Sequence, residues 1–169
     1  MEIILASFIT GLLIGNMYSK YLKRTNTTIF HNIEIKIGDD IFQATGLLDT
    51  GNMLKDTING KPVIVAEYTL FEQIFPETAS SSIKNFNTHI KIIDIINTKN
   101  LLNSNLAKRI SLVSYSSIGQ NNGILLGLKS DSVKIKGNCY KDVVLALTNF
   151  KLDSVKNKYQ LLLPTAYVR

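Results

Sequence analysis

Apolar and polar residues alternate along much of the chain with the two-residue period of half-buried β-strands. The first alternating run covers residues 31–37, and residues 38–40 supply a turn before a second apolar run at 41–48. Because a short turn joins these runs, they predict an antiparallel pair that ends at Asp49. Further strands are predicted at residues 62–66, 89–96, 110–115, 124–128, 132–136, 142–147 and 159–163.

The same pattern predicts few helices. Residues 68–75 predict one short helix that ends before Pro76, and the serine-rich stretch 77–87 predicts a loop. The chain contains no repeat and no low-complexity tract. Many short strands with few helices predict a mainly β fold, a small closed or sandwiched β domain.

The N-terminal residues 3–18 carry no charge. As a helix they would span roughly 24 Å, against roughly 30 Å for the hydrocarbon core of a bilayer, and Lys20 would extend the span by snorkelling. Glu2 precedes this segment, whereas Lys20, Lys23 and Arg24 follow it. That charge order predicts an uncleaved membrane anchor with the following residues in the cytoplasm. The alternative is a buried N-terminal helix.

The chain therefore divides into three predicted parts. Residues 1–24 form the anchor helix with its basic cytoplasmic flank, residues 25–29 form a polar linker, and residues 30–169 form the domain. The predicted location is the cell membrane, with the domain on the cytoplasmic side.

Composition narrows the possible partners. Hydrophobic residues make up 45% of the chain and charged residues 19%, which excludes global disorder. The net charge is +6, but the basic residues are scattered without interleaved aromatic residues, so nucleic acid is not a predicted partner. The single cysteine, Cys139, and the two histidines, His31 and His89, lack metal-ligand spacing. We therefore predict neither a metal nor a cofactor.

The candidate chemistry lies where the second predicted strand ends. Leu47 and Leu48 lead into the tripeptide Asp49-Thr50-Gly51. Two such carboxylates that face each other make an aspartic protease dyad, in which the like charges cannot both ionise. One tripeptide supplies half a site, so a homodimer with twofold symmetry would complete it. The tripeptide alone equally suits an ordinary hairpin turn.

Two spaced sets of residues resemble one protein family. The first is Leu47-Leu48-Asp49-Thr50-Gly51-Asn52-x-Leu54-x-Asp56, followed by Gly60-x-Pro62-Val63-x-Val65-x-Glu67. The second begins with Ser114-Tyr115-Ser116-Ser117-Ile118-Gly119 and continues through Asn122-Gly123 to Ile135. Over roughly residues 30 to 169, this pattern resembles the sporulation sigma-E-processing peptidases, the SpoIIGA family. The chain departs from the family pattern in two ways. Thr57 stands where the family usually has a proline, and the family carries several membrane spans before the domain, whereas this chain offers one at most.

The resemblance implies a retropepsin-like acid protease half that, as a homodimer, cleaves the precursor of a sporulation sigma factor at the membrane. In the dimer, the two Asp49 carboxyls would share one proton and hold the attacking water. Thr50 would bond to the partner subunit, and Gly51 would leave room for the substrate backbone. Asn52 and Asp56 are candidates to hydrogen-bond that backbone, although Asp56 would equally suit a turn cap.

Residues 117–125 are similar to the flap of retroviral-type proteases. This similarity makes Ser117, Ile118 and Gly119 candidate substrate-binding residues. Gly119 and Gly123 flank a polar tip at 120–122, which suits a hairpin that opens and closes over substrate. An ordinary hairpin without a ligand is the alternative.

Such proteases also need an apolar strand behind the catalytic turn, usually one that ends in glycine. Residues 124–127 have the residue types expected of this strand, because three apolar residues end in Gly127. Residues 161–164 have its expected place in the chain, after the flap and two further strands, with Pro164 in place of glycine. We favour residues 161–164. The rival to a protease is a non-catalytic β domain that binds a protein partner at the membrane, and a requirement for Asp49 in cleavage separates the two.

Overall fold

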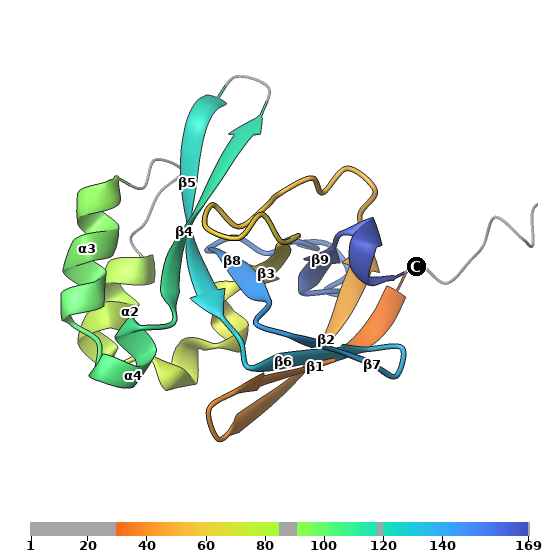
Figure 1. Ribbon diagram of the computed structural model, residues 1–169, viewed down its shortest axis with the longest axis horizontal. Helices are drawn as coiled ribbons and strands as arrows, with labels where there is room; N and C mark the ends of the chain where they lie inside the picture. The colour runs from red at the N-terminus through yellow and green to blue at the C-terminus, as the bar shows by residue number, and fades with distance from the viewer. Residues whose placement is uncertain (1–29, 85–90, 118–119, 169) are drawn as a thin grey trace, which may run out of the picture.

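The computed structural model describes residues 30–84, 91–117 and 120–168 (Figure 1). Within these residues, nine strands form one curled, mixed sheet in the order β4-β5-β8-β3-β9-β2-β1-β6-β7. The strands are β1 (Phe30–Ile37), β2 (Asp40–Leu48), β3 (Ile64–Glu67), β4 (Ile110–Ser117), β5 (Gln120–Lys129), β6 (Ser132–Ile135), β7 (Asn138–Lys141), β8 (Val144–Thr148) and β9 (Leu161–Leu163). The predicted mainly β fold is confirmed.

The predicted anchor at 1–24 and the linker at 25–29 lie outside the described residues. Among the residues that are described, no helix combines the length and apolar character needed to cross a membrane. The boundary predicted for the domain therefore stays a prediction.

The first predicted strand pair is confirmed. β1 and β2 pair antiparallel from Phe30 opposite Leu47 to Ile37 opposite Asp40, and Gly38 in the turn has φ +63°. Ile33, Ile35 and Ile37 turn one face of β1 into the core. Since this pair fixes where β2 ends, it also places the residues that follow Leu48.

The helical part differs from the prediction. It comprises the 3-10 helices η1 (Tyr68–Leu70), η2 (Glu72–Ile74) and η3 (Thr165–Tyr167), and the α-helices α2 (Glu77–Lys84), α3 (Ile92–Asn100) and α4 (Ser104–Ala107). The strand predicted at 89–96 and the loop predicted at 77–87 are wrong, because α3 and α2 occupy most of these stretches. The helix predicted at 68–75 is two 3-10 turns.

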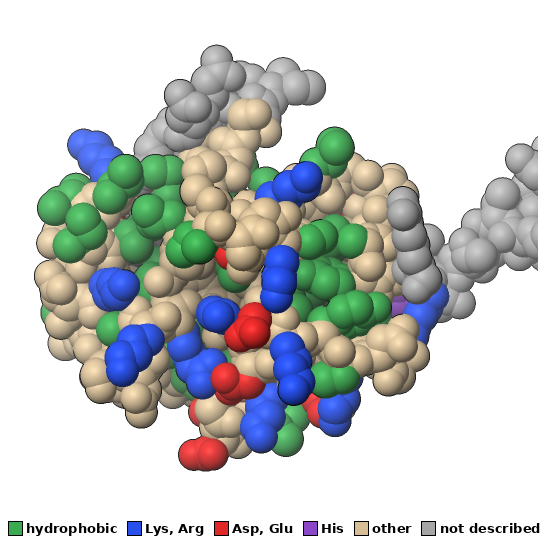
Figure 2. All heavy atoms as spheres, viewed as in Figure 1, with side chains coloured by type: hydrophobic (Ala, Val, Ile, Leu, Met, Phe, Trp, Pro, Cys, Tyr) green, Lys and Arg blue, Asp and Glu red, His purple; other side chains and the backbone are tan. Residues whose placement is uncertain are grey.

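Helix α3 shows why its pattern misleads. Its core face holds Ile95 and Thr98, while Ile92, Ile93 and Ile96 are each about half exposed. Apolar residues on both sides of a helix imitate the run of a strand. Figure 2 shows hydrophobic side chains over the upper part of the helical side, and again on the opposite side of this face, with Lys and Arg mixed with Asp and Glu between them.

A second, smaller hydrophobic cluster supports the segment that follows β2. Val63, Val113, Val144 and Ala146 are buried together, and Leu54 and Leu125 pack against them. This explains why all five residues of β8 are buried, because the main core covers the other face of the same strand. The cluster thereby ties the segment after β2 to β4 and β5.

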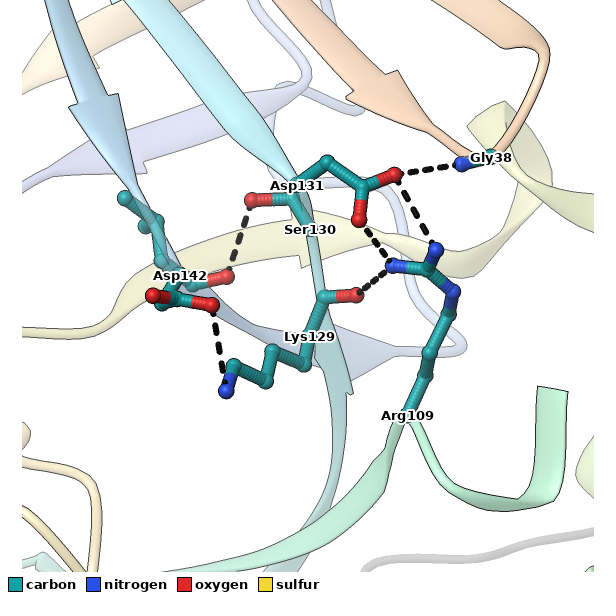
Figure 3. A network of polar contacts seen from close by, with 7 residues as sticks. Gly38, Arg109, Lys129, Ser130, Asp131 and Asp142 are labelled. Carbon is teal, nitrogen blue, oxygen red and sulfur yellow. Dashed lines mark hydrogen bonds and ion pairs between the residues drawn. The ribbon is translucent and has the colours of Figure 1, made fainter. Parts of the chain in front are cut away.

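A polar network joins the β1–β2 turn to the corner between β5 and β6 (Figure 3). The Arg109 guanidinium donates to both carboxylate oxygens of Asp131, at 2.7 and 3.1 Å, and the Gly38 N–H donates to Asp131 Oδ2 at 2.6 Å. The hydrogen bond from Arg109 is the largest cause that lowers the pKa of Asp131 below its ordinary value. The Asp131 carboxylate therefore keeps its charge to a lower pH than an unpaired aspartate would.

His31 gives the fold a dependence on pH. It is 9% exposed, and its buried Nε2 atom has no hydrogen-bond partner among the residues that the structure describes. Burial first, and the charge of Lys136 second, lower the pKa of His31 from 6.5. Because the unfolded chain then binds the proton more tightly, stability is fully present above pH 6.5 and is lost as the pH falls through the lower folded value.

We expect His31→Phe to reduce this loss of stability. Chemical denaturation of wild type and variant between about pH 8 and about pH 5 should give a flatter profile for the variant. As a control, Lys136→Gln should retain most of the wild-type slope, because burial is the larger cause. If the unfolding free energy of wild type and of His31→Phe falls equally with pH, His31 is not the cause of the loss of stability.

Candidate active site

Asp49 leaves the sheet at the end of β2. Its N–H donates to the Leu163 carbonyl at 2.9 Å, which continues the parallel pairing of Leu48 with Leu163. The Gly51 N–H donates to Asp49 Oδ1 at 2.9 Å, and the Asn52 N–H donates to the Asp49 carbonyl at 3.2 Å. These bonds close a tight turn that orients a half-buried carboxylate.

The strand behind this turn is β9. Leu161–Leu163 pairs parallel with Gly46–Leu48 and antiparallel with β3. The interpretation that favours residues 161–164 is confirmed, since residues 124–127 lie within β5, between β4 and β8. Pro164 then leads the chain into η3.

A hollow of about 520 Å³ opens beside Asp49. One side consists of the Asp49 turn and the residues that follow it, and the other consists of the outer part of β4. The lining residues are Asp49, Gly51, Asn52, Met53, Leu54, Lys55, Val65, Ser114, Tyr115 and Ser116. The fold thus brings together the two sets of residues that carried the family resemblance.

Strands β4 and β5 form the predicted hairpin, which projects beyond the rest of the sheet (Figure 1). Its last pair joins Ser117 to Gln120, so the polar tip predicted at 120–122 is wrong: those residues belong to β5. Gly123 lies opposite Tyr115, and a Cβ there would come within 2.3 Å of the Tyr115 ring. This glycine therefore admits the ring of Tyr115.

The predicted substrate-binding residues at the hairpin are not placed. Ile118 and Gly119 lie outside the described residues, and of Ser117 only the backbone is described. Their roles stay predictions.

The other predicted contacts lie in the segment after the turn. Asp56 is 5% exposed, and its carboxylate accepts from the Ile58 N–H at 3.4 Å, as the turn-cap alternative requires. Thr50 is exposed. Asn52 bonds to the protein's own backbone through both ends of its amide. The substrate contacts of Asn52 and Asp56, and the partner contact of Thr50, stay predictions.

Sequence reasoning assigned no role to several residues that line the hollow. Met53, Leu54, Val65 and Tyr115 give it apolar walls. Tyr115 stands inside the quoted motif that begins at Ser114, so the motif contained a signal for it. Within the described ranges, no three His, Cys, Asp or Glu side chains gather closely enough to hold a metal ion.

The fold and site define a mainly β domain in which an Asp-Thr-Gly turn opens into a hollow beneath a hairpin. The family model described as Sporulation factor SpoIIGA matches residues 1–167, so the chain belongs to that family, as the resemblance predicted.

Two curated relatives support this assignment. The sporulation sigma-E factor-processing peptidase of Priestia megaterium (strain ATCC 12872 / QMB1551) is 29% identical over 104 residues, which cover 62% of this chain and 32% of the relative. The protein of the same name from Bacillus subtilis (strain 168) is 27% identical over 104 residues, with the same shares. The chain spans about a third of the length of these relatives. No solved structure matches it.

Proposed function

We propose that the chain is an aspartic endopeptidase that cleaves the precursor of a sporulation sigma factor as a homodimer. The observation that carries this proposal is the Asp49 carboxylate, which is held by the Gly51 N–H and lines the hollow beside β4. Both relatives are named as processing peptidases of sigma-E factor.

The mechanism follows from two such carboxylates across a twofold axis. Close like charges keep one proton between them, so one Asp49 is ionised while the other is protonated. The ionised carboxylate takes a proton from a water, and the protonated one donates to the oxygen of the scissile carbonyl. Each chain then supplies half of a retropepsin-like site.

The surroundings of Asp49 suit a peptide substrate. The hollow continues from the turn along Ser114, Tyr115 and Ser116 of β4, so an extended peptide would pass between the turn and the hairpin. The hairpin residues beyond Ser117 would act as the flap that covers it.

The experiment is co-expression of the full chain with a candidate sigma-factor precursor in a non-sporulating host. The wild-type chain should shorten the precursor, seen as a size shift on a gel, and Asp49→Asn should leave it intact. Shortening that persists with Asp49→Asn would overturn the aspartic mechanism. Co-purification of the wild-type chain with an intact precursor would favour the alternative, a β domain that binds a protein partner without cleaving it.

The proposed location is the membrane, through residues 1–24, with the domain in the cytoplasm. The support is the uncharged run 3–18 followed by Lys20, Lys23 and Arg24. Protease added to intact protoplasts should then spare the domain, whereas lysed protoplasts should lose it. Digestion in intact protoplasts would overturn this orientation.

A further inference from the structure

We infer that Asn52 is a positioning residue: its side-chain amide holds the Asp49 turn against the sheet. The inference rests on the proposed function, and it gives Asn52 a role other than contact with the substrate.

The amide of Asn52 is occupied by the protein's own backbone. Its Nδ2 donates to the Val63 carbonyl at 3.0 Å and to the Leu162 carbonyl at 3.3 Å. Its Oδ1 accepts from the Leu54 N–H at 3.1 Å. A side-chain amide has two N–H donors, so both are used in these bonds.

These partners fix the turn relative to the strand behind it. Leu162 belongs to β9, and the next residue, Leu163, accepts from the Asp49 N–H. The Asn52 N–H in turn donates to the Asp49 carbonyl. Both ends of the turn are therefore tied to neighbouring residues of one buried strand, and also to each other.

The bond to Val63 adds a third point of attachment. Val63 is fully buried in the smaller cluster, just ahead of β3. The amide thus bridges the end of β2, the strand β9 and the approach to β3. Since a misplacement of about 1 Å at reacting groups can cost about a hundredfold in rate, loss of this bridge should slow catalysis.

The test is Asn52→Asp, which keeps the size of the side chain. A carboxylate still accepts from the Leu54 N–H but cannot donate to the carbonyls of Val63 and Leu162. With the purified full chain in detergent micelles and a precursor peptide, we expect kcat to fall about a hundredfold near neutral pH. KM should change by less than about threefold, because no substrate contact is removed.

The pH profile gives a second readout. Protonation of the introduced carboxyl restores one donor, so the kcat of the variant relative to wild type should rise as the pH falls towards about 4. Circular dichroism at each pH shows whether the variant is folded, because protonation would also restore a fold that the charged carboxylate had destabilised. Recovery of kcat in a variant that is folded throughout supports the inference, whereas recovery that only follows refolding overturns it.

Thr57→Val is the matched control. Thr57 ties a later part of the same segment to β4, through a 2.9 Å bond from Oγ1 to the Leu112 carbonyl. This variant should lower the melting temperature while kcat stays near wild type, as expected for a bond remote from the turn.

Several outcomes would overturn the inference. A raised KM with unchanged kcat would mean that Asn52 touches substrate. Unchanged kcat and KM would mean that Asn52 neither positions the Asp49 turn nor touches substrate. If Asn52→Asp does not fold, Asn52→Ser replaces it, and failure of both to fold would make Asn52 a requirement of the fold. Full activity of Asp49→Asn would instead overturn the proposed function.

Discussion

We expect Asp49→Asn to lower cleavage of the precursor by at least about a thousandfold, because the proposed dimer would lose both its general base and its general acid. The amide keeps the size of the side chain and can still accept from the Gly51 N–H, so the turn is expected to keep its form. Single-turnover cleavage with purified protein measures the loss. Circular dichroism checks that the variant remains folded.

Mixed dimers give the sharper form of this expectation. Each heterodimer of wild type with Asp49→Asn carries one carboxylate and should be inactive. If the subunits pair at random, an equal mixture then retains about one quarter of the activity, because activity follows the square of the wild-type fraction. Confinement by a membrane anchor would raise the effective concentration of a weak dimer, so the two chains should be co-expressed.

The control for mixing is a second, fully active subunit of different size. A tagged wild-type chain added in the same proportion should leave activity unchanged. Activity that falls only in proportion to the Asp49→Asn fraction would mean that each chain works alone, and it would end the homodimer proposal.

The part of the fold that the sequence predicted best is its most local part. β1 alternates cleanly, and the turn at Gly38 joins it to the apolar run of β2, so their pairing follows from neighbouring residues alone. The helices were harder to predict from the sequence. The serine-rich segment of α2 buries Ala79 and Ile83 four residues apart, a spacing that its weak overall hydrophobicity conceals. Whether such a segment forms a helix depends on its packing against residues that are distant in the sequence, and no local pattern records that packing.

The candidate site divides in the same way. Asp49 was found because a short tripeptide carries its chemistry. The role of Asn52 was missed, because its partners Val63 and Leu162 lie 11 and 110 residues away along the chain. Gly123 was predicted to flank the polar tip of a flap, but its register opposite Tyr115 shows a packing role that only the pairing of β4 with β5 reveals.

Gly46 and Leu163 provide a test of how the strand behind Asp49 is packed. Gly46 pairs with Leu161 of β9, and a Cβ at Gly46 would lie 2.8 Å from the Cγ and Cδ1 atoms of Leu163. Leu163 is fully buried, so its side chain is enclosed by other parts of the core. Gly46→Ala should therefore cost about 1–3 kcal/mol of unfolding free energy.

The partner change should cost more when made alone. Leu163→Ala leaves a cavity in the core and should cost about 2–5 kcal/mol. Made together, the two changes compensate, because the methyl group at position 46 enters the space that the leucine vacates. The double variant should be more stable than the sum of the single changes implies, by about 0.5–3 kcal/mol.

Urea denaturation of the four proteins in this cycle measures the coupling. A second cycle that pairs Gly46→Ala with Leu106→Ala, a buried leucine of α4, is the control and should be additive within about 0.5 kcal/mol. Additivity in both cycles would show that Gly46 is not needed for close approach to Leu163. Coupling confined to the first cycle would show that Gly46 permits the close approach of Leu163, the residue whose carbonyl accepts from the Asp49 N–H.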